Sequence, residues 1–479
     1  MGLSTQKFIQ LESVSAKSKL SALSIGLAAF FGSLLIYAGT VTSFLLYNGV
    51  FALMNIFAWA TLFSLLGSAM ILLVTQMFGL RIPTKILMGM GSILHLLGSM
   101  AFAYLVLADQ QSGFLVYAGA IICGLGEAFL ALTWGRICAT FKLRDALLNV
   151  AVASLIASGL YGLIVLAPSL VGVAIFMTAA IVASVVPLLV SGTMDKTVGE
   201  SGKSSPKRNN PAETFSTFKS FTNVIEEPAI GLFLFAFVMG LTCYFFFEVF
   251  WIYIAAMVSS SCLIMVTVFL PLKIPLTRFL YRSFIPILAV IVLAISNITQ
   301  VLFSESRVDM FFMLLLYTFA AVLTLSTLCA IANASEFSSD TIFSTALVLF
   351  AIASLAGLVC ANIFSNEVVL VIMTVITTLY ILFIFVSRSI RSGRNDVEQK
   401  KSKNEPGAII MRCSELADIY GLTAREYEVL VYLAQGYGNS YISEALFISQ
   451  NTVRTHIHNT YRKMGVSTRE QVIDLTRPV

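Results

Sequence analysis

Twelve long apolar runs follow one another through the first 387 residues of this 479-residue chain. A helix of about 20 apolar residues crosses the core of a bilayer, where its backbone polar groups need partners within the segment. We place the runs near 22–47, 50–78, 86–107, 114–138, 147–167, 170–191, 228–247, 249–272, 282–303, 309–333, 341–364 and 367–387. Charged residues make up only 11% of the chain, against about 25% in soluble proteins. The sequence therefore predicts an all-α fold that is mostly a polytopic twelve-helix membrane bundle.

Polar segments divide these runs into two halves of six. We expect six segments in order: an N-terminal arm (1–21), the first half of the membrane domain (22–191), a charged linker (192–227), the second half (228–387), a basic juxtamembrane linker (388–413) and a C-terminal domain (414–479). The basic linker is expected to be flexible and to lie near anionic lipid. Its alternative role is that of a basic arm that touches DNA phosphates.

A short repeat supports the division into halves. Residues 80–83 have the sequence Leu-Arg-Ile-Pro, and residues 272–275, at the same place in the second half, have the sequence Leu-Lys-Ile-Pro. Major-facilitator-type transporters are built from repeated halves of six spans, and the layout of this bundle resembles that superfamily. The superfamily's usual G-x-x-x-D-R-x-G-R-[RK] loop is absent, and residues 79–85 stand in its place. That absence weakens the prediction of transport activity.

Basic residues mark one side of the predicted bundle. Loops on that side contain Arg81, Lys85, Lys142, Arg144, the 192–223 stretch, Lys273, Arg278, Arg282, Arg388 and Arg391. The loop at 334–340 is the exception, because it contains Glu336 and Asp340 and no basic residue. Lys and Arg are enriched in the loops on the cytoplasmic side. We therefore expect a multi-pass protein of a bacterial cell (inner) membrane with both termini in the cytoplasm, where a chromosome is within reach.

The last 66 residues have the pattern of four short helices. Thr423 followed by Glu426 is a capping-box pattern that starts the first of them. In the third helix an inward face is predicted from a spacing of four, three and four residues, at Val453, Ile457, Thr460 and Met464. The opposite face then contains Gln450, Asn451, Arg454, Thr455, His458 and Arg462. Two helices joined by a tight turn, the second with such a face, suit the major groove of DNA. The alternative is a small helical domain whose charges only face water.

Sequence motifs in this segment make the prediction more specific. They are Leu422-Thr423, Arg425-Glu426, Glu428-Val429-Leu430, Gly436, Asn439, Ile448-Ser449, Thr452-Val453-Arg454, His456, Asn459 and Lys463-Met464-Gly465-Val466. With these residues the segment resembles the LuxR-type (GerE/NarL-like) helix-turn-helix domain. The resemblance implies a DNA partner, with Arg454, Thr455 and His458 facing bases and Thr452 and Lys463 facing phosphates. Gln450 and Asn451 complete the candidate interface, and the resemblance implies homodimerisation through the last helix.

Ionisable residues within the predicted spans are candidates for a ligand site, because each costs free energy in the membrane. Glu127 lies in the middle of the fourth run, and Trp134 follows seven residues later on the same helical face. A carboxylate beside an indole suits a cationic or hydrogen-bonding small molecule, although a packed or protonated glutamate is the alternative. His95 in the third run is a further candidate, with a packed, hydrogen-bonded role as its alternative. The aromatic run 244–253 is either an interfacial belt or part of a ligand site.

The sequence gives no support for an enzyme. It lacks a metal-ligand cluster, a Gly-rich phosphate loop and a nucleophile triad, and its seven cysteines include no CxxC pair. We therefore predict no catalytic residue, no metal and no cofactor. The whole chain resembles the membrane-bound LuxR-type regulators of anaerobic actinobacteria, which implies a one-component transcriptional regulator whose bundle senses a small molecule. The alternative function is a secondary transporter with a regulatory DNA-binding tail.

Overall fold

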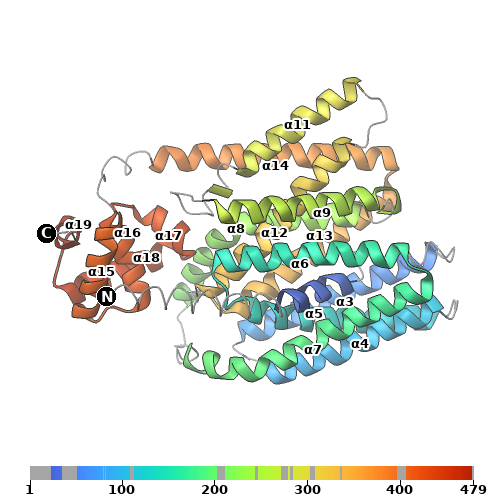
Figure 1. Cartoon of the computed structure of the whole chain (residues 1–479), viewed down its shortest axis with the longest axis horizontal. Helices are drawn as coiled ribbons and strands as arrows, with labels where there is room; N and C mark the ends of the chain where they lie inside the picture. The colour runs from blue at the N-terminus through green and yellow to red at the C-terminus, as the bar shows by residue number, and fades with distance from the viewer. Residues whose placement is uncertain are drawn as a thin grey trace.

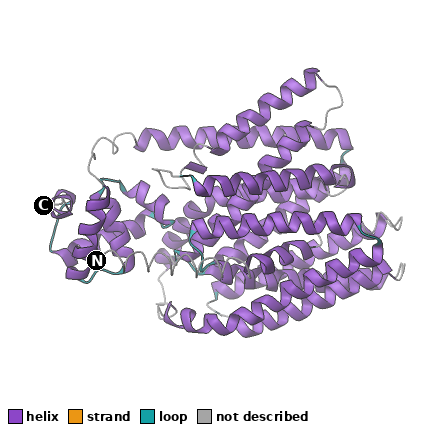
Figure 2. Cartoon of the chain, in the orientation of Figure 1, coloured by secondary structure: helices purple, strands orange, loops and turns teal. Residues whose placement is uncertain are grey.

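The structure is a computed structural model that describes most of the chain. The described residues are 23–34, 51–78, 80, 82–107, 113–201, 211–242, 246–270, 279–280, 284–302, 308–334, 337–395 and 406–476. Every regular element in these ranges is a helix, as Figure 2 shows. The prediction of an all-α fold is therefore confirmed.

Long apolar helices lie side by side in one bundle (Figure 1). The first half contains a helix at Leu23–Ser33, α3 (Phe51–Met77), α4 (Thr84–Leu107), α5 (Gly113–Cys138), α6 (Leu143–Leu166) and α7 (Ser169–Ser201). The second half contains α8 (Pro211–Thr242), α9 (Phe246–Phe269), α11 (Ile285–Leu302), α12 (Val308–Asn333), α13 (Ser339–Ile363) and α14 (Asn366–Asn395). Among the described residues, nine helices are long and apolar enough to cross a membrane. The number twelve itself stays a prediction.

Close backbone contacts hold the bundle together within and between its halves. α3 packs against α13, and α6 packs against α9, so both contacts join the first half to the second. Gly240 of α8 faces Gly357 of α13, and a Cβ on either residue would collide with the backbone of the other helix. Small residues at such crossings let helices approach closely, which favours association in lipid, where the hydrophobic effect between helices is weak.

Five short helices form a C-terminal domain at one end of the bundle (Figure 1). They are α15 (Pro406–Tyr420), α16 (Ala424–Ala434), α17 (Asn439–Leu446), α18 (Gln450–Met464) and α19 (Arg469–Thr476). We call residues 406–476 the C-terminal domain, and the end of the bundle beside it the domain end. α17 and α18 are the helix pair that the sequence predicts as a helix-turn-helix.

The C-terminal domain starts earlier than the sequence analysis expects. α14 continues to Asn395 and α15 begins at Pro406, so helix occupies much of the expected linker 388–413. Residues 396–405 lie outside the described ranges. Ile409, Cys413 and Leu416 of α15 recur at helical spacing, are buried, and pack in one cluster with residues of α16 and α19. The domain therefore has five helices, because this apolar stripe needs the rest of the domain to cover it.

Candidate functional site

The first helix of the predicted motif begins at a complete capping box. Thr423 Oγ1 accepts a hydrogen bond from Glu426 N at 3.3 Å, and Glu426 Oε2 accepts one from Thr423 N at 2.8 Å. Two backbone donors at the start of α16 are satisfied in this way, which stabilises the helix. The capping box that the sequence predicts is therefore present.

Glu426 also forms a half-buried ion pair with helix α18. Its Oε2 lies 2.6 Å from Lys463 Nζ, and the residue is only 4% exposed. Burial by itself raises the pKa of the Glu426 carboxyl. The hydrogen bonds from Lys463 and Thr423 outweigh burial, so this pKa lies below its ordinary value of 4.5. The carboxylate therefore stays charged and joins α16 to α18.

Lys463 has a second partner in the C-terminal domain. Besides Glu426, its ammonium donates to the backbone oxygen of Gly421 at 3.0 Å. These two bonds hold the ammonium at the start of α16, while the Lys463 side chain remains 30% exposed. Without DNA, Lys463 is thus bonded within its own domain, and its contact with phosphate stays a prediction. The helix-internal spacing could not show this, because Glu426 lies 37 residues away in the chain.

The turn between α17 and α18 is short and well defined. Phe447 ends α17 in the left-handed region at φ 56, which is uncommon for a residue other than glycine. Two residues later Ser449 starts α18, and its Oγ accepts a hydrogen bond from Thr452 N at 3.1 Å. Gly465 ends α18 at φ 68, in the left-handed conformation typical of glycine after a helix. The turn therefore fixes α18 against α17 as a helix-turn-helix requires.

The two faces of α18 differ as the sequence predicts. Val453, Thr460 and Met464 are buried in the C-terminal domain, and Ile457 is half-buried. On the other face five of the candidate residues are exposed and Thr452 is half-buried; the exposed ones are Gln450, Asn451, Arg454, Thr455 and His458. Arginine, asparagine, glutamine, threonine and histidine all reach base edges or phosphates in the major groove. The outer face of α18 therefore has the chemistry of a nucleic-acid interface.

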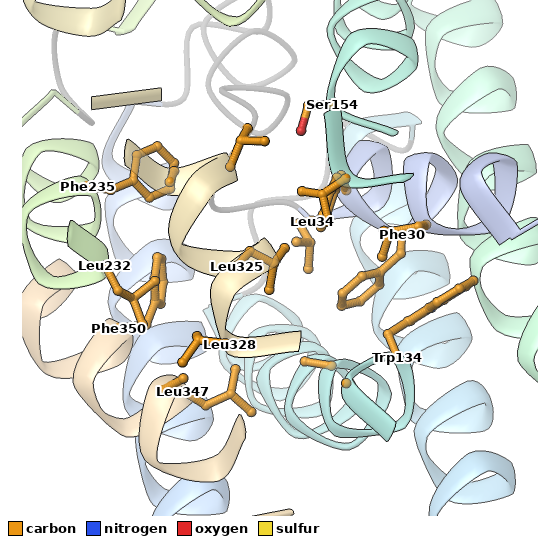
Figure 3. Close-up of a pocket in the computed structure, with 18 of the residues that line it drawn as sticks. Phe30, Leu34, Trp134, Ser154, Leu232, Phe235, Leu325, Leu328, Leu347 and Phe350 are labelled. Carbon is orange, nitrogen blue, oxygen red and sulfur yellow. The ribbon is translucent and has the colours of Figure 1, made fainter. Parts of the chain in front are cut away.

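A cavity of about 210 Å³ lies inside the bundle, between its two halves. Figure 3 shows Phe30 and Trp134 from the first half on one side and Leu232, Phe235 and Phe350 from the second half on the other. Most of the other lining residues are apolar as well. A cavity with such walls suits an organic molecule with a mainly apolar body.

Glu127 and Trp134 both line this cavity, as their seven-residue spacing on α5 suggests. Glu127 is 1% exposed, and its Oε1 accepts a weak hydrogen bond from Cys123 Sγ at 3.5 Å. Trp134 stacks on Phe30 with ring centroids 6.4 Å apart, and its indole N–H donates to Ala183 O at 3.3 Å. The arrangement places one carboxylate in a wall of aromatic and aliphatic groups.

His95 does not line the cavity itself, although it packs beside Phe30, which does. It is fully buried on α4, and its Nε2 lies 3.0 Å from Ser33 Oγ. The edge of Phe30 packs nearby, with ring centroids 6.4 Å apart. The structure therefore favours the packed, hydrogen-bonded role for His95, which joins the helix at Leu23–Ser33 to α4.

The aromatic run at 244–253 is divided between two environments. Tyr253 lines the cavity, whereas Trp251 is 52% exposed on the outside of the bundle. Residues 244–245 lie outside the described ranges. Successive helical residues point in different directions, so the run faces both the cavity and the outside, and both of its roles stay predictions.

An ion pair at the domain end was not predicted from the sequence. Arg136 of α5 binds Asp340 of α13 in two places, Nε to Oδ1 at 2.6 Å and Nη2 to Oδ2 at 2.7 Å. Arg136 also donates to the oxygens of Ile82 and Thr84, each at 3.1 Å. The only sequence signal is Asp340 itself, in the one loop on the predicted cytoplasmic side that lacks a basic residue. The pair joins the first half of the bundle to the second.

Comparison with known proteins identifies relatives of the C-terminal domain. Residues 421–476 match the family described as bacterial regulatory proteins, luxR family. The chain is 48% identical over 52 residues to the transcriptional regulatory protein DegU of Brevibacillus brevis, covering 11% of this chain and 22% of that protein. It is 46% identical over 52 residues to the CsgBAC operon transcriptional regulatory protein of Escherichia coli strain K12, covering 11% and 24%. This chain therefore spans less than a quarter of the length of these relatives.

The bundle has a structural neighbour among solved transporters. The human organic anion transporter MFSD10 (TETRAN) superposes with a TM-score of 0.50 at 14% sequence identity, covering 77% of this chain and 99% of that one. At this identity the similarity shows the fold alone. With the long apolar helices, it confirms the prediction of a multi-pass membrane protein with a major-facilitator-like bundle followed by a LuxR-type helix-turn-helix domain.

Proposed function

We propose that this protein is a membrane-embedded, one-component transcriptional regulator. Its bundle binds a small molecule, and its C-terminal domain binds promoter DNA. The observation that carries the proposal is the exposed polar face of α18 on a LuxR-type domain that lies in the same chain as a membrane bundle. The regulators and the transporter to which the chain is similar are not named as enzymes, and we propose no enzymatic activity.

In the proposed DNA complex α18 enters the major groove. Arg454, Thr455 and His458 face bases, and Gln450, Asn451 and Thr452 at the start of α18 contact bases or the backbone. The exposure of five of these six residues supports the assignment.

Two copies of the chain pair through α19 on a two-fold site. On α19, Glu470 and Leu475 are exposed and Ile473 is half-buried, whereas Val472 is buried in its own domain.

The proposed ligand site is the cavity between the two halves. Its apolar walls suit a compound with an aromatic or aliphatic body, and the carboxyl group of Glu127 suits a positive charge or a hydrogen-bond donor on that compound. Trp134 offers an aromatic face to the same molecule. A ligand with these properties binds both halves, so it favours the bundle state in which the two walls fit it best.

The proposed location is a bacterial inner membrane, with both termini and the C-terminal domain in the cytoplasm. The excess of Lys and Arg in the loops on that side supports this orientation. The domain end of the bundle is then its cytoplasmic end. This position allows a membrane protein to reach chromosomal DNA.

Transcript profiling tests the proposed function. A deletion strain is complemented with the wild type or with Arg454→Ala, and each culture is grown with and without a panel of aromatic amines and phenols. We expect Arg454→Ala to leave the same transcripts altered as the deletion does, at unchanged protein level in the membrane. A profile identical to that of the wild type would show that α18 does not read the promoter.

Glu127→Gln tests the ligand site in the same strains. The amide keeps the shape of the side chain and removes its negative charge, so we expect the ligand response to shift while DNA binding persists. Glu127→Asp, which keeps the charge, is the control. A dose–response curve of Glu127→Gln that overlays the wild type would assign Glu127 to packing.

The second candidate function is secondary transport with a regulatory tail. The transporter-like fold and the cavity between the halves favour it. Uptake of a ligand into vesicles against its gradient, driven by a proton or sodium gradient, would support this alternative. Binding without such uptake would support the regulator.

A further inference from the structure

The C-terminal domain contacts the bundle at the last residues of α12. The guanidinium of Arg425 donates from Nη2 to the backbone oxygen of Asn333 at 3.4 Å, 92 residues earlier in the chain. Ala334, the next residue, is buried in the same apolar cluster as Val429 and Leu433 of α16. A surface of the bundle thus completes an apolar cluster of the C-terminal domain.

One side chain belongs to both apolar cores. Phe447, which ends α17, is half-buried and packs against the cluster of the C-terminal domain and against the core of the bundle. Its left-handed backbone places it at the turn before α18. Because the ring is shared, the two cores cannot separate without exposing apolar surface, which costs free energy.

The surface that receives the domain lies where the two halves of the bundle meet. Asn333 Nδ2 donates to the backbone oxygen of Ala139 at 3.0 Å, so the end of α12 is bound to the residue that follows α5. Arg136, one turn earlier on α5, pairs with Asp340 at the start of α13. α5 belongs to the first half, and α12 and α13 belong to the second. The geometry of this surface therefore depends on how the halves sit against each other at the domain end.

The cavity is adjacent to the same junction. Gly135 and Phe343 both line the cavity, and a Cβ on Gly135 would lie 2.5 Å from the ring of Phe343. Gly135 directly precedes Arg136, and Phe343 lies one turn after Asp340. A molecule in the cavity that moves Gly135 away from Phe343 therefore acts directly on the Arg136–Asp340 pair.

We propose that the face of the C-terminal domain formed by Arg425, Val429, Leu433 and Phe447 is a docking surface for the bundle at Asn333 and Ala334. The domain stays docked while the two halves are closed at the domain end, and separation of Arg136 from Asp340 releases it. This inference rests on the proposed function for its regulatory meaning. The contact itself is independent of DNA.

Docking restrains the domain and leaves its recognition helix uncovered. Gln450, Arg454 and His458 on the outer face of α18 are exposed while Phe447 and Arg425 contact the bundle. What docking fixes is the position of α18 relative to the membrane. Two α18 helices must lie one turn of DNA apart to bind a two-fold site. Release therefore gives two domains the freedom to reach that spacing, and we expect promoter affinity to rise on release.

Rotational mobility of the domain tests the docking surface. The full-length protein is placed in nanodiscs of phosphatidylethanolamine and phosphatidylglycerol, with a fluorescent dye joined enzymatically to its C-terminus. In the wild type we expect the anisotropy decay to follow the slow rotation of the nanodisc. In Ala334→Glu a charge enters the apolar contact, so we expect the faster rotation of a released domain to increase several-fold in amplitude.

Two further variants and one control complete the test. Arg425→Glu changes the docking contact on the C-terminal domain, and Asp340→Asn weakens the ion pair between the two halves. Both variants are expected to show the faster rotation. Leu80→Glu is the matched control, because Leu80 lies at the domain end, is exposed, and is not a member of either apolar cluster of the C-terminal domain among the described residues. The anisotropy decay of Leu80→Glu should match that of the wild type.

The outcomes separate docking from the proposed function. Slow rotation in both Ala334→Glu and Arg425→Glu would overturn the docking surface, whatever the protein does to DNA. Fast rotation in these two variants but not in Asp340→Asn would overturn the link to the junction and keep the surface. If the variants release the domain and neither they nor the wild type bind any promoter, docking stands and the proposed function fails.

Discussion

Arg136 and Asp340 form a bidentate ion pair that connects α5 in the first half of the bundle to α13 in the second, with Nε and Oδ1 2.6 Å apart. Their side chains are only 15% and 10% exposed. Two parallel hydrogen bonds between a guanidinium and a carboxylate fix both distance and orientation. The two halves are therefore held in register at the end that carries the C-terminal domain.

Removal of either member of this pair is expected to destabilise the protein strongly. The loss of stability in the double variant should be smaller than the sum of the two single losses. Arg136→Ala leaves the Asp340 carboxylate poorly solvated, and Asp340→Ala does the same to the guanidinium; a buried pair broken in this way costs about 3–5 kcal/mol. In the double variant no charge is stranded, so the effects are not additive. Thermal unfolding midpoints of the four proteins in one detergent measure this coupling.

An exposed ion pair provides the control for that cycle. Arg412 and Glu415 in α15 are 2.8 Å apart with side chains 35% and 55% exposed. Exposed pairs contribute about 0–1 kcal/mol, so Arg412→Ala should shift the midpoint little. Additive losses in the Arg136 and Asp340 cycle would show that the two side chains act independently.

Thr460 is expected to be a site where a substitution increases stability. Its side chain is fully buried in the C-terminal domain, and its Oγ1 has no hydrogen-bond partner among the described residues. A buried, unsatisfied hydroxyl costs about 1–3 kcal/mol, and valine has nearly the same shape without it. Thr460→Val should therefore raise the free energy of unfolding of the isolated domain, residues 406–479, by about 1 kcal/mol. Urea unfolding measures the change.

Thr455→Val is the matched control for this substitution. Thr455 is exposed on the same helix, and its Oγ1 donates to Asn451 O at 3.0 Å. At Thr455 the same substitution removes a hydroxyl that is hydrogen-bonded and exposed to water, so no gain in stability is expected. A gain of equal size at both positions would point to helix propensity and away from the buried hydroxyl.

The Glu426–Lys463 ion pair predicts how acid affects the C-terminal domain. Because the pKa of Glu426 is lower in the folded domain than its ordinary value of 4.5, the unfolded chain takes up the proton first. The stability that the pair contributes is therefore complete above about pH 5 and is lost as the pH falls through the folded pKa. Glu426→Gln should unfold more easily at pH 7 and lose less stability than the wild type between pH 6 and pH 4, in urea titrations at each pH.

Lys463→Arg and Lys463→Met separate charge from packing in that experiment. Arginine keeps a positive charge near Glu426, whereas methionine keeps the length and removes the charge. We expect Lys463→Met to flatten the pH dependence less than Glu426→Gln does, because the hydrogen bonds from Thr423 to Glu426 remain. An unchanged pH dependence in Lys463→Met would show that the acid sensitivity does not depend on the Lys463 ammonium.

Local patterns explain which parts of this structure could be predicted from the sequence. The capping box at Thr423 and Glu426, the inward face of α18 and the glycine at 465 are all set by residues within one turn or one helix. Glu127 and Trp134 share the cavity because a spacing of seven residues brings side chains to the same face of a straight helix. These features therefore needed no knowledge of the fold.

The features that the sequence did not predict depend on contacts between distant segments. Arg136 and Asp340 are 204 residues apart, and no local pattern pairs them. The partner of His95 is Ser33, which lies on a different helix and 62 residues away in the chain. The apolar stripe of α15 packs against α16 and α19, and the stripe alone does not show which helices cover it. Contacts of this kind arise from packing, which a single sequence does not display.

Pairing of two C-terminal domains is expected to set the strength of DNA binding. Between residues 406 and 479 acidic residues are as numerous as basic ones, so non-specific attraction to phosphates should be small. A single α18 in one groove makes a limited interface, whereas two helices one turn apart bind a two-fold site together. We therefore expect the isolated domain to be mostly monomeric and to bind its promoter weakly.

Titration of promoter DNA tests this expectation with two proteins, the isolated domain and the same domain fused to a dimeric coiled coil. The fusion should bind more tightly, because the second domain then binds at a high effective concentration. Arg454→Ala should weaken binding by about 1–3 kcal/mol per domain if the guanidinium contacts a base directly, and this loss should appear in both proteins. Equal affinity of the isolated domain and the fusion would mean that pairing does not control binding. A ligand in the bundle would then have to act on the domain by a route that does not depend on pairing.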